Sequence, residues 1–251
     1  MPDFRIIILA AGEGKRMNAG QAKVLVKLRG RPMLLRVLDA VKASGVDAKP
    51  IVVIAAGQRG EEVKHACASY DVTCVVQSQQ LGTGHAVQVC QSVVGDAGHV
   101  MVLYGDQPLI KAATIKRLAD EHAASGNFLT MASATVADFS DWRSSFKGFG
   151  RILRNQTNEV IAIIESKDAA PEQLESEKEV NPAYFCFQAS RLWQELKKLN
   201  TNNAQAELYL TDLVALTAGE PKTIINIDPV EALGINSPEG LAQAEALLNA
   251  E

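Results

Sequence analysis

The sequence predicts an α/β fold: an open, mainly parallel, Rossmann-like sheet with helices on both faces and a small added β lobe. Strand-like and helix-like segments alternate up to about residue 137, and this alternation is typical of parallel sheets covered by helices. The first such segment is Arg5–Leu9. After Arg5 it contains only branched apolar residues, as a strand buried on both faces requires. After residue 137 the alternation gives way to shorter strand-like segments.

The elements of the first half are predicted from hydrophobic periodicity. In residues 32–44, for example, the apolar side chains repeat every three or four positions, which indicates a helix with one buried face. The predicted strands are Arg5–Leu9, Ile51–Ala55, Val72–Val76, His99–Tyr104 and Phe128–Ala134. The predicted helices are Pro32–Ser44, Glu61–Ser69, Gly84–Val94 and Ala112–Ala124.

The second half is predicted to add strands and a terminal helix to the same domain. Arg151–Leu153 and Val160–Glu165 form a hairpin-like pair around a polar turn, and further strands are expected at Ala183–Phe187 and Thr223–Ile227. The predicted helices are Arg191–Leu199, Tyr209–Ala218 and Ser237–Ala250, the last with Ser237 as its N-cap. Since no linker rich in Pro, Gly or Ser separates the halves, we expect one domain over residues 1–251.

The composition excludes several classes of function. The formal net charge is −4 and no long basic run occurs, so nucleic acid is not an expected partner. The four cysteines form no C-x-x-C pair, which favours reduced thiols and a cytoplasmic location over a structural zinc site. The apolar run Ile6–Ala11 is too short to cross a membrane, so no membrane association is expected either.

A glycine-rich turn follows the first predicted strand. Its sequence, Leu9-Ala-Ala-Gly-Glu-Gly-Lys-Arg-Met17, has small residues that let backbone N–H groups approach a triphosphate. Arg16 and Lys23 can add positive charge to such a site. The dinucleotide fingerprint lacks its third glycine here, and no Walker A motif is present. A tight turn without a ligand would use the same glycines.

Polar side chains also follow two later strands. Gln77 and Gln80 come after the third predicted strand, and a glutamine amide can both donate to and accept from the edge of a nucleobase. Asp106 ends a buried strand, where a parallel sheet binds its ligands and where a magnesium ligand is expected. The alternatives are a polar loop with Thr83 as a helix N-cap, and a turn aspartate.

These motifs resemble those of a known enzyme family. L-A-A-G-x-G-x-R-M followed by a lysine is similar to the signature of sugar-nucleotide pyrophosphorylases, specifically the N-acetylglucosamine-1-phosphate uridylyltransferases that form the N-terminal domain of bifunctional GlmU enzymes. The resemblance extends from about Arg5 to about Gln243. It implies the nucleotide-diphospho-sugar transferase fold, a nucleotide-binding half (about 1–137), a sugar-phosphate-binding half (about 138–251), UTP as donor and Mg²⁺ as cofactor.

The resemblance also implies roles for individual residues. The segment Q-x-x-Q-L-G-T-G-H-A matches the uracil site, Y-G-D the metal site, and N-N-A-Q-x-E the sugar site. The implied nucleotide contacts are Leu9, Ala10, Ala11, Gly12, Gly14, Arg16, Lys23, Gln77, Gln80, Gly82 and Thr83. The implied sugar contacts are Tyr104, Gly105, Gly150, Glu165, Asn181, Glu207, Tyr209 and Thr211. Asp106 and Asn236 are the implied Mg²⁺ ligands, and Arg16, Lys23 and Asp106 the implied catalytic residues.

The chain departs from the family pattern at two places. Pro182-Ala183-Tyr184 replaces the residues after the asparagine of V-N-T-G, so an altered wall of the sugar site is expected. Ala206 replaces a glycine and Leu208 a tyrosine in the N-N-A-Q segment, for which a capped amphipathic helix is the alternative interpretation.

The implied reaction is attack of a sugar-1-phosphate oxygen on the α-phosphorus of UTP, which releases pyrophosphate. Because the nucleophile is already an anion, positioning and charge neutralisation are needed rather than a general base. The alternatives left open are a same-fold enzyme for another sugar, an alditol phosphate or CTP, and a non-catalytic sugar-nucleotide sensor. No hexapeptide repeats of a left-handed β-helix domain occur, so acetyl transfer is not expected; the oligomeric state is open.

Overall fold

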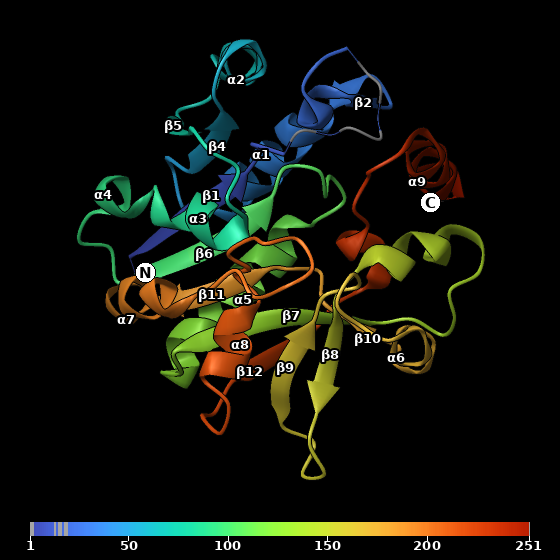
Figure 1. Cartoon of the computed structure of the whole chain (residues 1–251). Coiled ribbons are helices and arrows are strands. Elements are labelled where there is room, and N and C mark those ends of the chain that lie inside the picture. The colour runs from blue at the N-terminus through green and yellow to red at the C-terminus, as the bar shows by residue number, and fades with distance from the viewer. Residues whose placement is uncertain (1–2, 13, 15–16, 18–19, 251) are drawn as a thin grey trace.

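The computed structural model describes residues 3–12, 14, 17 and 20–250 of the chain. Within these residues a ten-stranded sheet runs through the molecule, and helices cover both of its faces (Figure 1). The strand order is β5-β4-β1-β6-β11-β7-β10-β8-β9, and β12 pairs with β7. Its strands are β1 Phe4–Leu9, β4 Ile51–Ala55, β5 Thr73–Gln77, β6 His99–Tyr104, β7 Leu129–Thr135, β8 Arg151–Arg154, β9 Val160–Ile164, β10 Glu179–Val180, β11 Phe185–Gln188 and β12 Thr223–Asn226.

The helices lie mostly between the strands that the sequence predicts. They are α1 Met33–Ser44, α2 Gln58–Ala66, α3 Thr83–Gln88, α4 Gln91–Val94, α5 Ala112–Ser125, α6 Pro171–Ser176, α7 Ala189–Glu195, α8 Asp212–Leu216 and α9 Pro238–Ala250. Short 3₁₀ helices are η2 Lys23–Leu25, η3 Asp141–Gly148, η4 Leu196–Lys198 and η5 Pro229–Ala232, and a small hairpin is formed by β2 Lys27–Leu28 and β3 Arg31–Pro32. No helix in the described part of the chain combines the length and the apolar character needed to cross a bilayer.

The burial of β1 on both faces explains the apolar run Ile6–Leu9 that follows Arg5. Ile6 and Ile8 are buried in the hydrophobic cluster on one face of the sheet, and Ile7 is buried in the cluster on the other face. Helices α1 and α5 contribute to the first cluster, while α3 and α7 contribute to the second. Where a strand buries both sets of alternating side chains, apolar residues are favoured on both faces.

The point at which ligands are expected lies at the carboxyl end of β1. This strand pairs in parallel with β4 on one side and with β6 on the other. The chain therefore turns in opposite directions from β1, and the crevice at such a switch point is the usual ligand site of an open α/β sheet. Ala10, Ala11 and Gly12 follow β1, and Asp106 follows β6, so these residues belong to this crevice.

The second half of the chain is built into the same sheet. Strand β11 lies antiparallel between β6 and β7, and β12 runs parallel to β7. The predicted hairpin is present, since β8 and β9 pair in antiparallel register at the edge of the sheet (Figure 1). Helix α9 begins as predicted, with Ser237 Oγ accepting a hydrogen bond from the Gly240 N–H at 3.2 Å.

Two helix predictions differ from the structure: one predicted helix is split in two, and the helix predicted over Tyr209–Ala218 is present but shorter, as α8. The segment predicted as one helix over 84–94 forms the two short helices α3 and α4, and its N-cap is Gly82 rather than Thr83. The hydroxyl of Thr83 instead accepts a hydrogen bond from the Leu210 N–H at 2.9 Å. Residues 200–211 form no helix, and α8 begins only at Asp212. Backbone groups of Leu208 and Leu210 form hydrogen bonds to residues 81–84 instead of bonds within a helix.

Candidate functional site

Two adjoining cavities lie at the carboxyl ends of β1, β5 and β6. The larger has a volume of about 510 Å³ and the smaller about 260 Å³. Four residues line both of them: Thr83, Tyr104, Asp106 and Glu207. We call the larger the donor cavity and the smaller the acceptor cavity. If each cavity held one ligand, the two ligands would meet at these four residues.

The donor cavity gathers most of the predicted nucleotide contacts. Those that line it are Leu9, Ala10, Ala11, Gly12, Lys23, Gln77, Gln80, Gly82 and Thr83. Gly14 does not line it but supports Lys23: Gly14 has φ +62°, and a Cβ there would lie 2.5 Å from the Cβ of Lys23. Only glycine permits that backbone with so close a neighbour. Arg16 lies outside the described residues, so its role stays a prediction.

Gln77 is held rigidly at the end of β5. Its side chain is buried, and its amide nitrogen donates to the carbonyl of Gly82 at 3.1 Å. The same nitrogen lies 3.1 Å from Nδ1 of His85. Because an amide nitrogen carries two protons, these neighbours engage its donors and leave the oxygen for a ligand. His85 thus has a positioning contact with Gln77.

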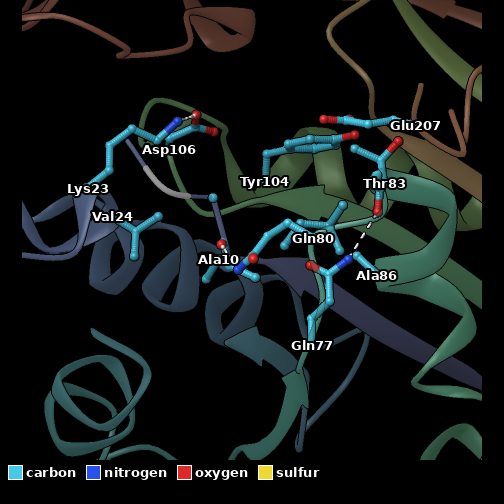
Figure 2. Close-up of a pocket in the computed structure, with 14 residues that line it drawn as sticks. Ala10, Lys23, Val24, Gln77, Gln80, Thr83, Ala86, Tyr104, Asp106 and Glu207 are labelled. Atoms are coloured by element: carbon cyan, nitrogen blue, oxygen red, sulfur yellow. Dashed lines mark hydrogen bonds and ion pairs between the residues drawn. The ribbon is translucent and has the colours of Figure 1, made fainter. Parts of the chain in front are cut away.

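Gln80 connects two walls of the donor cavity. Its amide nitrogen donates to the carbonyl of Ala11 at 3.3 Å, so the segment after β5 is joined to the turn after β1. Figure 2 shows the two glutamines on the side of the cavity away from Lys23 and Asp106. The cavity therefore has an amide-bearing end and a charged end.

The charged end is formed by three residues that are distant in sequence. The ammonium group of Lys23 lies 2.5 Å from Oδ2 of Asp106 and 2.9 Å from Oδ1 of Asn236. The side chains of Lys23 and Asp106 are only 13% and 14% exposed. The carboxylate and the amide oxygen predicted to bind Mg²⁺ therefore both reach one cation, which in this structure is the lysine ammonium (Figure 2 shows its contact with Asp106).

Backbone contacts hold this charged end in place. The N–H of Ile235 donates to the carbonyl of Asp106 at 2.9 Å, which brings the segment before Asn236 against the end of β6. The N–H of Gly105 donates to the carbonyl of Leu9 at 3.0 Å. Gly105 lines neither of the two cavities, because it packs behind them against Leu34 and Val24. Its predicted sugar contact therefore does not match its position.

The acceptor cavity gathers the remaining predicted sugar contacts. Tyr104, Gly150, Glu165, Asn181, Glu207, Tyr209 and Thr211 all line it. The hydroxyl of Thr211 donates to Oε1 of Glu165 at 2.8 Å. Burial raises the pKa of Glu165 despite this hydrogen bond, and the carboxylates of Asp212 and Asp168 act in the same direction. One oxygen of Glu165 is thus fixed by Thr211, and a second remains for a ligand.

Two of the three residues in the altered segment 182–184 belong to the wall of the acceptor cavity. Pro182 and Ala183 line the acceptor cavity, but Tyr184 does not. Its ring is fully buried, and its hydroxyl donates to the carbonyl of Glu231 at 2.8 Å. The bulk of Tyr184 is therefore accommodated in the core. Ala183 has φ +65°, a left-handed conformation that strains a residue with a Cβ.

The segment 203–208 closes the cavities from the second half of the chain. Gly84 N–H donates to the carbonyl of Leu208 at 2.7 Å, and Leu208 N–H donates to that of Leu81 at 2.8 Å. A Cβ on Gly82, at φ +106°, would lie 2.6 Å from the Leu208 carbonyl oxygen, so a side chain there is excluded. Ala206 also adopts a left-handed backbone, with φ +52°. This contact brings Glu207 to the border of both cavities.

Several lining residues were not predicted from the sequence. Val24 and Ala86 line the donor cavity, and Gln107, Gly148, Phe149, Gln205 and Gly234 line the acceptor cavity. Most are neighbours of predicted residues, so proximity in sequence was the available signal. Gln107 carried a clearer one, because a polar residue directly after Asp106 stands at the same strand end.

Comparison with curated proteins finds relatives that match nearly the whole length of this chain. The chain is 40% identical over 245 residues to the bifunctional protein GlmU of Clostridium botulinum (strain Eklund 17B / Type B). The alignment covers 96% of this chain and 51% of that protein. The chain is 42% identical over 248 residues to the bifunctional protein GlmU of Paraburkholderia phytofirmans, at 97% and 52% coverage. The chain thus spans about half the length of these relatives.

Comparison with solved structures confirms the predicted fold. A candidate glucose-1-phosphate thymidylyltransferase from Bacillus anthracis, crystallised with sucrose, superposes with a TM-score of 0.75. The alignment covers 97% of this chain and 94% of that one at 19% sequence identity, so the likeness concerns the fold alone.

The model of one protein family matches most of the chain. It describes the MobA-like NTP transferase domain and matches residues 6–214, which include the glycine-rich turn, the glutamine segment and Asp106. Together with the identity to the GlmU proteins, this match places the chain in a family defined by nucleotidyl transfer. The chain therefore belongs to the MobA-like NTP transferase domain family and is a GlmU-like nucleotidyltransferase.

Proposed function

We propose that this chain transfers UMP from UTP to a sugar-1-phosphate, with N-acetylglucosamine-1-phosphate as the acceptor, and releases pyrophosphate. The observation that carries the proposal is the pair of adjoining cavities with Asp106 on their common border. A transfer between two phosphates requires both substrates to meet beside groups that neutralise charge. The border of these cavities offers such a place.

The donor cavity supplies contacts for a nucleoside triphosphate. Gln77 presents its amide oxygen to the base, because its nitrogen is already engaged by Gly82 and His85. The small residues Ala10, Ala11 and Gly12 line this cavity, so phosphates can approach the backbone there closely. Lys23, near the border with the acceptor cavity, is in position to stabilise the departing pyrophosphate.

The charge of the two cavities supports a divalent cation. Among the described residues that line them, the carboxylates of Asp106, Glu165 and Glu207 outnumber the single ammonium of Lys23. Two phosphate anions would be repelled by that surplus unless a cation joined them. Asp106 and Asn236 fit this need, because one carboxylate and one amide oxygen reach a common cation, and Mg²⁺ favours a few oxygen ligands completed by substrate phosphates.

The proposed chemical step is an in-line displacement. A bond forms between an oxygen of the acceptor's phosphate and the α-phosphorus of UTP, while the bond from that phosphorus to the oxygen bridging to the β-phosphate breaks. The pair of electrons leaves with pyrophosphate. Bound Mg²⁺ would supply charge neutralisation at the phosphoryl oxygens. The chain's own residues hold the two anions in line, and no side chain has to remove a proton.

The acceptor cavity supplies contacts for the sugar ring. Glu165 keeps one carboxylate oxygen available beside Gly150, because Thr211 occupies the other. Asn181 uses its side-chain oxygen on the Ala183 N–H at 2.9 Å, which leaves its amide donor for the ligand. A carboxylate acceptor and an amide donor facing one small cavity suit the alternating hydroxyl and amide groups of an amino-sugar derivative.

A matrix of substrates tests the proposal directly. Pyrophosphate release is measured with UTP and CTP against N-acetylglucosamine-1-phosphate, other hexose-1-phosphates and an alditol phosphate, each with Mg²⁺. We expect the UTP and N-acetylglucosamine-1-phosphate pair to have the highest kcat/KM. Absence of turnover with every sugar phosphate would contradict the proposal and would favour a non-catalytic sensor, provided that UDP-sugar still binds.

The matrix includes CTP because of the position of Gln77. Its free oxygen can accept the N3–H of uracil, but it can equally accept an amino proton of cytosine. Discrimination between the two bases must then come from backbone groups around the same cavity. Higher kcat/KM with CTP than with UTP would assign the donor to cytidine without changing the rest of the mechanism.

A further inference from the structure

The altered wall of the acceptor cavity is joined to the segment that carries Asn236. The amide nitrogen of Gln107 donates to the carbonyl of Pro182 at 2.8 Å and to that of Ala232 at 3.2 Å. The Tyr184 hydroxyl donates to the carbonyl of Glu231 at 2.8 Å. Gln107 is 5% exposed and Tyr184 is fully buried, so water competes little for these bonds. We call residues 181–184 the acceptor wall and 231–236 the metal segment.

The same metal segment is also attached to Asp106. Ile235 N–H donates to the Asp106 carbonyl at 2.9 Å, and Asn236 follows directly. Gln107 itself is the neighbour of Asp106 in the chain. A displacement of the acceptor wall is therefore transmitted through Gln107 and Tyr184 to the segment that sets the distance between Asp106 and Asn236.

Gln107 donates its two hydrogen bonds while its own side-chain oxygen stays unpaired within the described part of the chain. The side-chain oxygen of Gln107 is buried and has no hydrogen-bond partner among the described residues. A buried acceptor without a partner costs free energy; an apolar side chain of similar length would avoid that cost but would leave the carbonyls of Pro182 and Ala232 without this donor. The two donated bonds fix the position of the acceptor wall relative to the metal segment.

We propose that Gln107 and Tyr184 are positioning residues that couple the acceptor wall to the metal segment, so that acceptor and cation each strengthen the binding of the other. The inference rests on the proposed function, since it takes a sugar phosphate as the acceptor. Coupling between two sites is reciprocal, so it can be measured from either ligand. The element that links the two sites is the metal segment, held by the wall on one side and by Asp106 on the other.

Two variants and one control isolate the coupling. Gln107→Met keeps the length of the side chain but removes both donated bonds, and Tyr184→Phe removes a single buried hydroxyl. Ser44→Ala is the control, because Ser44 is also buried and its hydroxyl donates to the Val41 carbonyl at 2.6 Å in α1, outside both cavities. If the effect of these substitutions is merely structural, the melting temperature falls alike in all three variants.

The measurement is Mn²⁺ binding by electron paramagnetic resonance, with a UTP analogue that has an imido bridge between the α- and β-phosphates. In the wild-type chain and in Ser44→Ala, saturating N-acetylglucosamine-1-phosphate should tighten Mn²⁺ binding at least about fivefold. In Gln107→Met and Tyr184→Phe the tightening should fall below about twofold. In turnover assays the same two variants should raise the acceptor's KM, whereas Ser44→Ala should not.

Wild-type coupling that persists in both variants, or that Ser44→Ala loses as well, would overturn the inference. The failure of the proposed function has a different signature, namely no turnover with any sugar phosphate. In that case Mn²⁺ binding with the nucleotide analogue alone decides: weaker binding in both variants than in Ser44→Ala supports positioning of Asn236, and equal binding refutes it.

Discussion

The buried imidazole of His122 should make the protein unfold more easily in acid. His122 is only 1% exposed, and its Nδ1 lies 2.9 Å from the hydroxyl of Thr130. Its ring meets those of His99 and Phe4 at 5.0 and 5.9 Å between centroids. Burial lowers the pKa of His122 to about 4, and the neighbouring His99 acts in the same direction.

The magnitude follows from the two protonation states. An imidazole in the unfolded chain has a pKa near 6.5, so the folded state binds fewer protons between pH 6.5 and 4. This group's contribution to stability is therefore fully present above pH 6.5 and is lost as the pH falls through 4. At about 1.36 kcal/mol for each pH unit, the loss amounts to about 3 kcal/mol in the free energy of unfolding.

Urea unfolding between pH 8 and pH 4 measures this loss. The matched variant is His122→Leu combined with Thr130→Val, which removes the titrating ring and the hydroxyl that it contacts. The wild type should lose about 3 kcal/mol more than the variant between pH 7 and pH 4. Two curves that run parallel over this range would refute the reasoning, because the acid sensitivity would then come from other groups.

Three further predictions concern the site. Asp106→Asn should lower kcat at least about 100-fold while circular dichroism and the melting temperature show a folded protein, and near-normal turnover would remove Asp106 from the site. Glu165→Ala should cost about 1–3 kcal/mol in the acceptor's kcat/KM, measured across several sugar phosphates, and should leave the KM of UTP unchanged; a loss of UTP affinity instead would show that Glu165 faces the donor. Ala183→Gly should raise the melting temperature by about 1–3 °C in calorimetry, because relief of left-handed strain exceeds the added entropy of the unfolded chain, and a decrease would show that the Cβ makes a stabilising contact.

Local patterns were sufficient for much of the fold. The alternation of Ile6, Ile7 and Ile8 between the two faces of the sheet requires a strand that is buried on both sides, and the sequence shows this directly. The glycine-rich turn and Asp106 stand at strand ends, so their place at the ligand-binding edge follows from periodicity and chain direction. Hydrophobic period and backbone preference act within a few residues, which is why they can be predicted without coordinates.

Predictions that depended on distant partners were less successful. A capped helix was the alternative interpretation of residues 202–212, but the backbone of Leu208 pairs with Leu81 and Gly84, and the Leu210 N–H donates to Thr83. Tyr184 was expected to change the acceptor site, yet its ring is buried and its hydroxyl bonds to Glu231. In both cases a hydrogen bond to a distant segment decided where the residue lies, and local sequence preference does not contain that information.

The sequence by itself determined the class of the sheet, the strand ends at which ligands gather and the residue types available there. Only the tertiary structure decided that Lys23 meets Asp106 and Asn236, which lie 83 and 213 residues further along the chain. It also decided that Gln107 joins two walls of one cavity. The physical reason is that strand order and loop closure bring distant segments together, and β11 enters the sheet between β6 and β7 although 49 residues separate β7 from it.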